Sequence, residues 1–165
     1  MNNITLIGMP GVGKSTIGVV LAKVLGYQFL DSDLLIQKQE KRKLHQIIAQ
    51  EGNDGFQAIE NRVNASIEAE ETVIATGGSV VYCQEAMEHL KSVGTVVYLK
   101  LSLNELSKRL GNLKGKEGQT LADLYRERTP LYEKYADIVI DQEGQDLETC
   151  LQAVLETLEK QKSNC

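Results

Sequence analysis

The chain has 165 residues, of which 42% are hydrophobic and 25% are charged, so its composition is that of a globular domain and global disorder is excluded. Its formal net charge is −5, from 18 basic and 23 acidic residues, and it shows none of the basic excess typical of nucleic-acid binding. No apolar run approaches the about 20 residues that a membrane-spanning helix needs, and the first residues lack the basic segment of a signal peptide.

The cysteines and histidines form no metal-binding pattern. Three cysteines, Cys83, Cys150 and Cys165, are odd in number and far apart, and His45 and His89 stand alone. Neither a CxxC motif nor a Cys/His cluster occurs. This pattern is typical of a reduced, cytoplasmic protein without structural zinc.

The first half of the chain alternates short β-prone runs with segments of helical periodicity. Residues 3–7 are a β-prone run followed by glycine, and apolar residues then recur every three or four positions as far as Gly26, a helix stop signal. In chain order we predict strands at 3–7, 27–30 and 72–76, and helices at 14–25, 34–40, 44–50 and 56–69.

The second half continues this alternation. We predict strands at 95–101 and 136–141, and helices at 85–91, 103–110, 121–128 and 147–159, with fraying after 159. Pro130 is expected to end the helix that begins at 121. The polar segment 111–120 contains three glycines and no apolar stripe, which predicts a mobile loop. Strands alternating with helices indicate the α/β class: a single domain over 1–165 whose five-stranded parallel sheet has helices on both faces.

A glycine-rich segment separates the first strand from the first helix. The sequence GMPGVGKS, from Gly8 to Ser15, fits the phosphate-binding pattern GxxxxGK(S/T). Glycines let backbone N–H groups turn toward an anion, and the helix adds the positive end of its dipole. Lys14 would neutralise the β- and γ-phosphates, and the Ser15 hydroxyl would contact Mg²⁺. The predicted nucleotide-binding residues are Gly11, Val12, Gly13, Lys14, Ser15 and Thr16.

Two later turns also follow strands. Asp31 and Asp33 lie at the end of the second strand, where ligands bind in open α/β sheets. Their alternative role is structural, because Ser32 or Asp33 would also suit the cap of the next helix. Gly77 and Gly78 follow the third strand, and glycine there permits a close backbone approach to a ligand or simply a tight turn.

Four motifs occur in a fixed order: GMPGVGKSTIG, FLDSD, ATGG and ERTPLY. Together they resemble shikimate kinases, a branch of the nucleoside-monophosphate-kinase-like P-loop proteins, over nearly the whole chain. The resemblance implies the sheet order 2-3-1-4-5. It also implies transfer of the ATP γ-phosphate to a hydroxyl of shikimate, a step of chorismate and aromatic amino-acid biosynthesis.

The same resemblance implies roles for individual residues. Asp31 would act through water on Mg²⁺, and Asp33 would bind the acceptor hydroxyls and serve as the base. Gly77 and Gly78 would contact the acceptor and the γ-phosphate. Arg128 would bind the acceptor carboxylate. Two further expectations are that Arg109 stacks on adenine and that residues 32–62 form the acceptor-binding helical region.

The chain departs from the family pattern in the acceptor region. Gln57 stands where family members have an arginine for the carboxylate, and an amide has no charge to offer. Glu60, which keeps that arginine in place in the family, would lose its partner. Arg62 is five positions from Gln57 and would point to another face of the helix, so it is a poor substitute. Ser79 replaces the third glycine of the turn.

The second departure lies in the segment 111–120. The family has a lid arginine there, beside the transferring phosphate. Lys116 occupies its place when residues are counted from Arg109, and we predict it as a catalytic residue together with Asp33 and Lys14. Lys114 is the other candidate. A lysine neutralises charge but does not form the two-pronged contacts of arginine.

Three functions fit these observations. The first is a shikimate kinase that makes shikimate 3-phosphate. The second is a kinase of the same fold for another small polyol or sugar-like acceptor without a carboxylate, which Gln57 would suit. The third is a non-catalytic, nucleotide-binding regulatory protein, suggested by the altered lid. We expect ATP and Mg²⁺ as cofactors, a small hydroxylated metabolite as partner, no nucleic-acid or membrane partner, and a cytoplasmic monomer.

Overall fold

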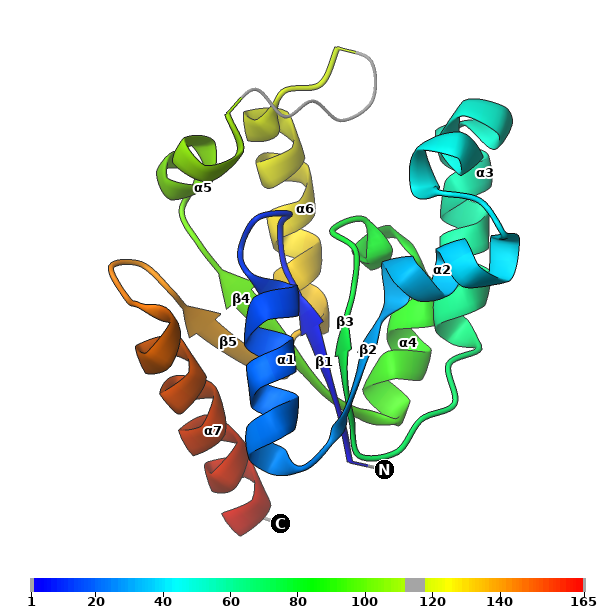
Figure 1. Cartoon of the computed structure of the whole chain (residues 1–165). Helices are drawn as coiled ribbons and strands as arrows, with labels where there is room; N and C mark the ends of the chain where they lie inside the picture. Colours follow the sequence, from blue (N-terminus) through cyan, green and yellow to red (C-terminus); the bar gives the residue numbers. More distant parts are fainter. Residues whose placement is uncertain (1, 112–117, 165) are drawn as a thin grey trace.

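Five parallel strands form the centre of the structure, a computed structural model that describes residues 2–111 and 118–164 (Figure 1). Their order is β2-β3-β1-β4-β5, as the resemblance implied. The strands are β1 (Asn3–Ile7), β2 (Gln28–Asp31), β3 (Thr72–Ala75), β4 (Gly94–Lys100) and β5 (Ile138–Asp141). Each of the four neighbouring pairs is parallel, which requires a crossover between successive strands.

Helices provide these crossovers and cover both faces of the sheet. Helices α1 and α7 lie side by side on one face, and α4 and α6 lie on the other (Figure 1). The helices are α1 (Lys14–Leu25), α2 (Ser32–Glu40), α3 (Leu44–Ala65), α4 (Gln84–Ser92), α5 (Leu103–Leu110), α6 (Leu121–Tyr135) and α7 (Leu147–Ser163), with a short 3₁₀ helix, η1 (Val80–Tyr82).

The main core lies on the sheet, and a smaller one lies beside it. All residues of β1 and β3 are buried, as expected for central strands with helices on both faces. A separate cluster of Ile36, Ile47, Ile59 and Val63 packs α2 against α3. This second cluster holds α2 and α3 together. These two helices and the segment between them contain residues 32–62, the region that we predicted to bind the acceptor.

The register of the sheet brings the predicted site residues to one edge. Ala75 of β3 pairs with Leu6 of β1 on one side and with Asp31 of β2 on the other. The segments that follow these strands therefore begin at the same level, at the upper edge of the sheet in Figure 1. They contain the glycine-rich loop, the Asp31–Asp33 turn and the Gly77–Gly78 turn.

The structure corrects several element boundaries. The two helices predicted at 44–50 and 56–69 are both present and meet at Gly52 (φ 74°, ψ 176°), whose non-helical backbone separates the two halves of α3; the second half ends at Ala65 rather than at 69. Helix α7 continues to Ser163 rather than fraying after 159. The helix η1 was not expected, because three residues with two adjacent valines carry no helical period.

Pro130 does not end α6, contrary to the prediction. The helix runs through it to Tyr135. The last turn is anchored by the fully buried Tyr132, whose ring stacks on Tyr98 with centroids 5.1 Å apart. This packing offsets the one helical hydrogen bond that proline cannot donate.

Among residues 2–111 and 118–164, no helix combines the length and the apolar character that crossing a membrane requires.

Candidate active site

The glycine-rich loop bends around the start of α1. Gly11 (φ 87°) and Gly13 (φ 96°) both adopt the left-handed conformation, which residues with a side chain rarely occupy. Gly13 is also the cap of α1, so the loop runs directly into the positive end of the helix. Val12 is buried and its N–H donates to the Met9 carbonyl, whereas Thr16 is exposed on the first turn of α1. This is the geometry of an anion-binding loop.

Lys14 lies inside this loop. Its ammonium donates to the carbonyl oxygens of Gly8, at 2.6 Å, and Met9, at 2.9 Å. Burial lowers the pKa of Lys14 to about 8, against the opposing effect of the nearby Asp33 carboxylate. A buried cation that has only carbonyl partners is well suited to receive the negative charge of a phosphate.

Ser15 and Asp31 come together as predicted for a magnesium site. The Ser15 hydroxyl donates to Asp31 Oδ2 at 3.4 Å. Asp31 Oδ1 accepts the N–H groups of Asp33, at 2.9 Å, and Leu34, at 3.2 Å, and so caps α2. The cap is therefore Asp31, and neither Ser32 nor Asp33. One carboxylate serves both purposes, because each of its oxygens faces a different partner.

Asp33 packs against the first glycine of the turn after β3. A Cβ atom on Gly77 would lie 2.7 Å from Asp33 Oδ1 and 3.3 Å from Glu60 Oε2. The glycine is needed here to leave room for two carboxyl groups, which is a more specific reason than the backbone approach to a ligand that we predicted. Burial raises the pKa of Asp33, and the neighbouring Asp31 raises it further, while Lys14 lowers it.

The second glycine makes room for two other groups. A Cβ atom on Gly78 would lie 2.8 Å from Cδ of Pro10 in the glycine-rich loop and 2.9 Å from Nη1 of Arg128. The Gly78 carbonyl accepts the Tyr132 hydroxyl at 2.6 Å. Gly78 is thus the point where the phosphate-binding loop, the turn after β3 and helix α6 meet.

A cavity of about 380 Å³ opens between α3 and α6, next to this point. Gln57 and Arg128, both predicted for the acceptor, lie in its wall. Its other lining residues are Ile48, Asn53, Phe56, Ser79, Tyr82, Gln119, Leu124 and Glu127. The wall therefore combines apolar surface with amides, hydroxyls, one cation (Arg128) and one carboxylate (Glu127), which suits a small polar molecule with several hydrogen-bonding groups.

Arg128 is held in the cavity wall by Tyr82. Its Nε donates to the Tyr82 hydroxyl at 3.3 Å, and its guanidinium carbon lies 5.4 Å from the centre of the Tyr82 ring. Arg128 is in the middle of α6, so it is not a solvated cation at a helix end. Among the described residues it forms no salt bridge, and its charge is available to a ligand.

Glu60 is buried without a cation of its own. It is 1% exposed, and the Ser79 hydroxyl lies 2.8 Å from Oε1 and 2.9 Å from Oε2. Arg62 does not replace the missing arginine, because it pairs with Glu40 at 2.9 Å. With glutamine at position 57, Glu60 lacks the arginine that it would contact in the family. The serine at position 79 gives its carboxyl a hydrogen-bond donor instead.

Arg109 lies beside the glycine-rich loop, where its Nη1 donates to the Gly11 carbonyl at 3.0 Å. This contact places the guanidinium next to the residues that we predicted to bind the nucleotide. Lys114 and Lys116, the two candidates for the lid cation, lie outside the described residues. The role of this cation stays a prediction.

Sequence reasoning missed Tyr82 as a site residue, and it missed the pairing of Ser79 with Glu60. Tyr82 follows the glycine turn by four residues, and only η1 brings its side chain back to Arg128. The pairing of Ser79 with Glu60 was indicated only indirectly, because the two departures from the family pattern at Gln57 and Ser79 both fall in segments predicted to contact the acceptor. The contact of Ser79 with Glu60 joins α3 to the turn after β3, which no spacing in the sequence indicates.

Comparison with known proteins agrees with this geometry. The family model described as shikimate kinase matches residues 10–159. The shikimate kinase of Moorella thermoacetica is 36% identical over 163 residues, 94% of each chain. Shikimate kinase 2 of Yersinia enterocolitica is 36% identical over 148 residues, 84% of this chain and 85% of its own. A solved structure of shikimate kinase from Acinetobacter baumannii in complex with shikimate has a TM-score of 0.87 and 32% identity, and covers 98% of this chain and 95% of its own.

The sheet order, the phosphate-binding loop and the adjoining cavity define a P-loop kinase that acts on small molecules. The chain belongs to the shikimate kinase family. The fold class and the enzyme class predicted from the motifs are therefore confirmed.

Proposed function

We propose that this protein transfers the γ-phosphoryl group of ATP to a hydroxyl of shikimate. The observation that carries the proposal is the meeting at Gly78 of the phosphate-binding loop with Arg128, a cation that lines the adjoining cavity. In the proposal, a site for a triphosphate lies next to a site for a small anion, and these contacts support it. Shikimate carries both the hydroxyls and the carboxylate that such a pair of sites requires.

In the proposed reaction, Asp33 accepts the proton of the attacking hydroxyl. The acceptor oxygen forms a bond to the γ-phosphorus while the bond to the bridging oxygen of ADP breaks. Burial and Asp31 raise the pKa of Asp33, which brings the carboxylate closer to the basicity that proton transfer needs. Lys14 neutralises charge on the phosphates from inside the loop.

Ser15 and Asp31 are the residues that would hold Mg²⁺. Both offer oxygen atoms, the ligands that Mg²⁺ prefers, and they lie 3.4 Å apart. No cluster of three or more acidic, histidine or cysteine side chains suited to a metal occurs among the described residues, and Mg²⁺ in such enzymes takes few protein ligands. When bound, the ion would neutralise phosphate charge. In the structure, the Ser15 hydroxyl donates to Asp31, and Asp31 caps the start of α2.

A second candidate acceptor is a small polyol without a carboxylate. Gln57 favours it, because this side chain lies in the cavity wall and provides an amide where a second cation would bind a carboxylate. Arg128 favours shikimate, since a free guanidinium in a cavity is poorly used by a neutral molecule.

A coupled assay of ADP release, with shikimate and its neutral methyl ester as matched acceptors, tests the proposal. We expect turnover of shikimate and a kcat/KM at least about 10-fold lower for the ester, the effect of one charge-assisted hydrogen bond. A higher kcat/KM for the ester would favour the polyol kinase, and no turnover of shikimate would overturn the proposal. Gln57→Arg should lower the KM for shikimate and leave that for the ester unchanged.

The Asp33→Asn variant separates the enzyme from a non-catalytic regulator. It keeps the size of the side chain but removes the base, so phosphoryl transfer should be lost while ADP binding persists. A cellular role that survives this substitution would contradict the proposal and favour the regulatory function.

The proposal extends to the setting of the enzyme. A cytoplasmic location is supported by Cys83 and Cys150, which are free and buried as in proteins of reducing compartments. We expect a monomer, and size-exclusion chromatography with light scattering would test this. A single kinase domain over 1–165 and a lid at 111–120 stay predictions of the sequence.

A further inference from the structure

Ser79 is the only described side chain that gives the carboxyl group of Glu60 a hydrogen bond shorter than 3.5 Å. Its hydroxyl oxygen is within 2.9 Å of both carboxyl oxygens, and Ser79 is one of the residues that line the cavity between α3 and α6. Glu60 is 1% exposed and is not among the residues that line this cavity. Ser79 therefore stands between a buried acid and the space where the acceptor would bind.

A serine hydroxyl has one proton to donate, and the state of Glu60 decides where that proton goes. An ionised carboxylate only accepts hydrogen bonds, so it takes the serine proton and turns the donor away from the cavity. A protonated carboxyl has a donor of its own, which it directs at the serine oxygen. The Ser79 proton is then free to point into the cavity.

We propose that Ser79 and Glu60 are positioning residues that make the binding of an anionic acceptor depend on protonation of Glu60. The proton does two things at once: it removes a negative charge beside the cavity-lining Ser79, and it frees the Ser79 hydroxyl to donate to the acceptor. The inference rests on the proposed function, because it takes shikimate, a carboxylate, as the acceptor.

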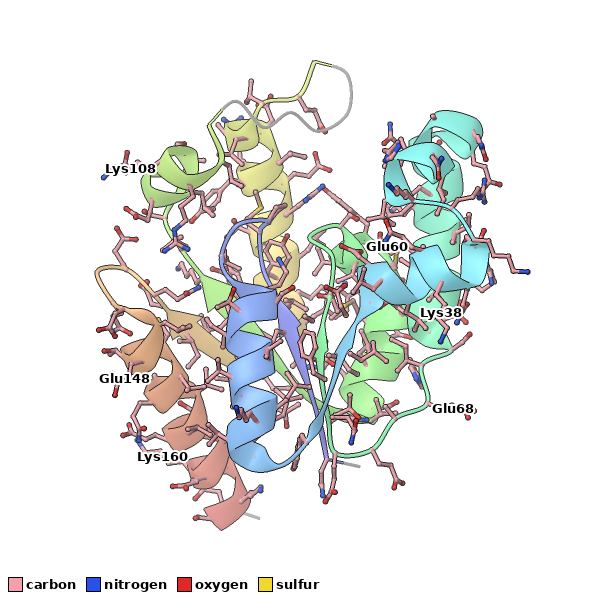
Figure 2. The ribbon with its side chains drawn as sticks, viewed as in Figure 1. Lys38, Glu60, Glu68, Lys108, Glu148 and Lys160 are labelled. Carbon is pink, nitrogen blue, oxygen red and sulfur yellow. The ribbon has the colours of Figure 1, made fainter. Side chains whose placement is uncertain are left out.

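The surroundings of Glu60 place this protonation near neutral pH. The charged and titratable groups that face its carboxyl are Asp33 from α2, Arg128 from α6 and Cys83 at the end of η1. Burial, more than any of these, raises the pKa of Glu60 to about 7, and Asp33 adds to the effect. The hydrogen bonds of Ser79 and Cys83 and the charge of Arg128 lower it. Figure 2 shows Glu60 toward the inside of the molecule, whereas Glu68, another glutamate beyond the same helix, lies at its edge.

The pH dependence of the KM for shikimate, at saturating ATP, tests the inference in two variants and a control. In the wild type the KM should rise about 3- to 10-fold as pH increases through 7, the effect of one hydrogen bond. Glu60→Gln resembles the protonated acid, so its KM should stay low and flat while kcat keeps the wild-type pH profile. Ser79→Ala removes a hydrogen bond that lowers the pKa, so the rise should move to higher pH and start from a higher KM.

Glu68→Gln is the matched control, because Glu68 is exposed and should leave the pH profile unchanged. Carboxyl ¹³C NMR of the protein without substrate provides a readout that needs no turnover: the signal lost in Glu60→Gln should titrate near pH 7, and higher in Ser79→Ala. A flat wild-type KM, a rise that persists in Glu60→Gln, or a Glu60 signal that titrates near pH 4 to 5 would overturn the inference. Absence of shikimate turnover, by contrast, would reject the proposed function, and the NMR titration would still decide the protonation of Glu60.

Discussion

At the scale of single residues, the candidate site contains ionisable groups that are buried although their charged forms are more stable in water. Lys14 has a lowered pKa, and Glu60 and Asp33 have raised ones, chiefly because all three are removed from water. Burial of ionisable groups lowers stability unless partners satisfy them. Their presence at one edge of the sheet is therefore a mark of function rather than of folding.

Glu60 should make the stability of the protein fall as pH rises. Its pKa is about 7 when folded against a reference value of 4.5, so its contribution is complete below about pH 4.5 and is lost as pH rises through 7. Between pH 5 and 8 the free energy of unfolding should fall by about 2–3 kcal/mol on this account. Urea denaturation at several pH values would show this, with Glu60→Gln lacking that decrease and Glu68→Gln retaining it.

Gly77→Ala and Gly78→Ala should affect different kinetic parameters. The first variant places a methyl group 2.7 Å from Asp33 Oδ1 and should lower kcat about 100-fold, because it displaces the carboxylate that we propose as the base. The second places it 2.8 Å from Pro10 Cδ in the glycine-rich loop and 2.9 Å from Arg128 Nη1, so it should raise the KM for the acceptor and also weaken ADP binding. Steady-state kinetics and ADP titrations would check both variants, and equal effects on kcat would contradict the assignment.

At the scale of elements, helix ends hold the site in place. Helix α1 begins at the phosphate-binding loop, and α2 begins at Asp31, whose two oxygens serve the helix cap and Ser15 separately. The sequence DSD indicated a helix cap at this position, but it did not indicate which of the three polar residues would form the cap. That choice follows from the direction in which β2 leads the chain into α2.

Asp31→Asn should separate the cap from the magnesium role. Asparagine caps a helix as well as aspartate does, so stability should change by less than about 0.5 kcal/mol, whereas Asp31→Ala should cost about 1 kcal/mol. Both variants should need more Mg²⁺ for half-maximal activity. Thermal unfolding and magnesium titrations would measure the two effects, and normal magnesium dependence in both variants would exclude Asp31 from the metal site.

At the scale of the whole molecule, the edge of the sheet opposite the site is held together by a buried asparagine. Asn3 Nδ2 donates to the carbonyls of Ala69, at 2.7 Å, and Val93, at 3.2 Å, and its Oδ1 accepts the Thr72 N–H at 3.1 Å. One side chain thereby joins the starts of β1 and β3 and the residue before β4. These hydrogen bonds of Asn3, which we call the clamp, hold β1, β3 and β4 together at the end opposite the candidate site.

Asn3→Ala should therefore destabilise the fold without changing the chemistry. It removes the side-chain partner of the buried Thr72 N–H and of the half-buried Ala69 carbonyl, whereas the Val93 carbonyl keeps the Asn3 backbone N–H, so the free energy of unfolding should fall by about 1–3 kcal/mol. Because the clamp lies at the far edge of the sheet, kcat at 25 °C should stay at the wild-type value. Asn2→Ala, at an exposed neighbour, is the control for chemical denaturation. A large loss of kcat in a folded Asn3→Ala protein would contradict this separation.

The sequence by itself determined the fold class, the phosphate-binding loop, the acidic pair and the family. These follow from local periodicity and from motifs whose residues are close in the chain, where spacing alone fixes geometry. It was wrong at Pro130, because the packing of Tyr132 in the core outweighs one lost hydrogen bond. Only the tertiary structure decided that Ser79 partners Glu60 and that Tyr82 holds Arg128, because these contacts join residues 19 and 46 positions apart. Such pairs are set by how helices dock on the sheet, and docking depends on packing over the whole chain.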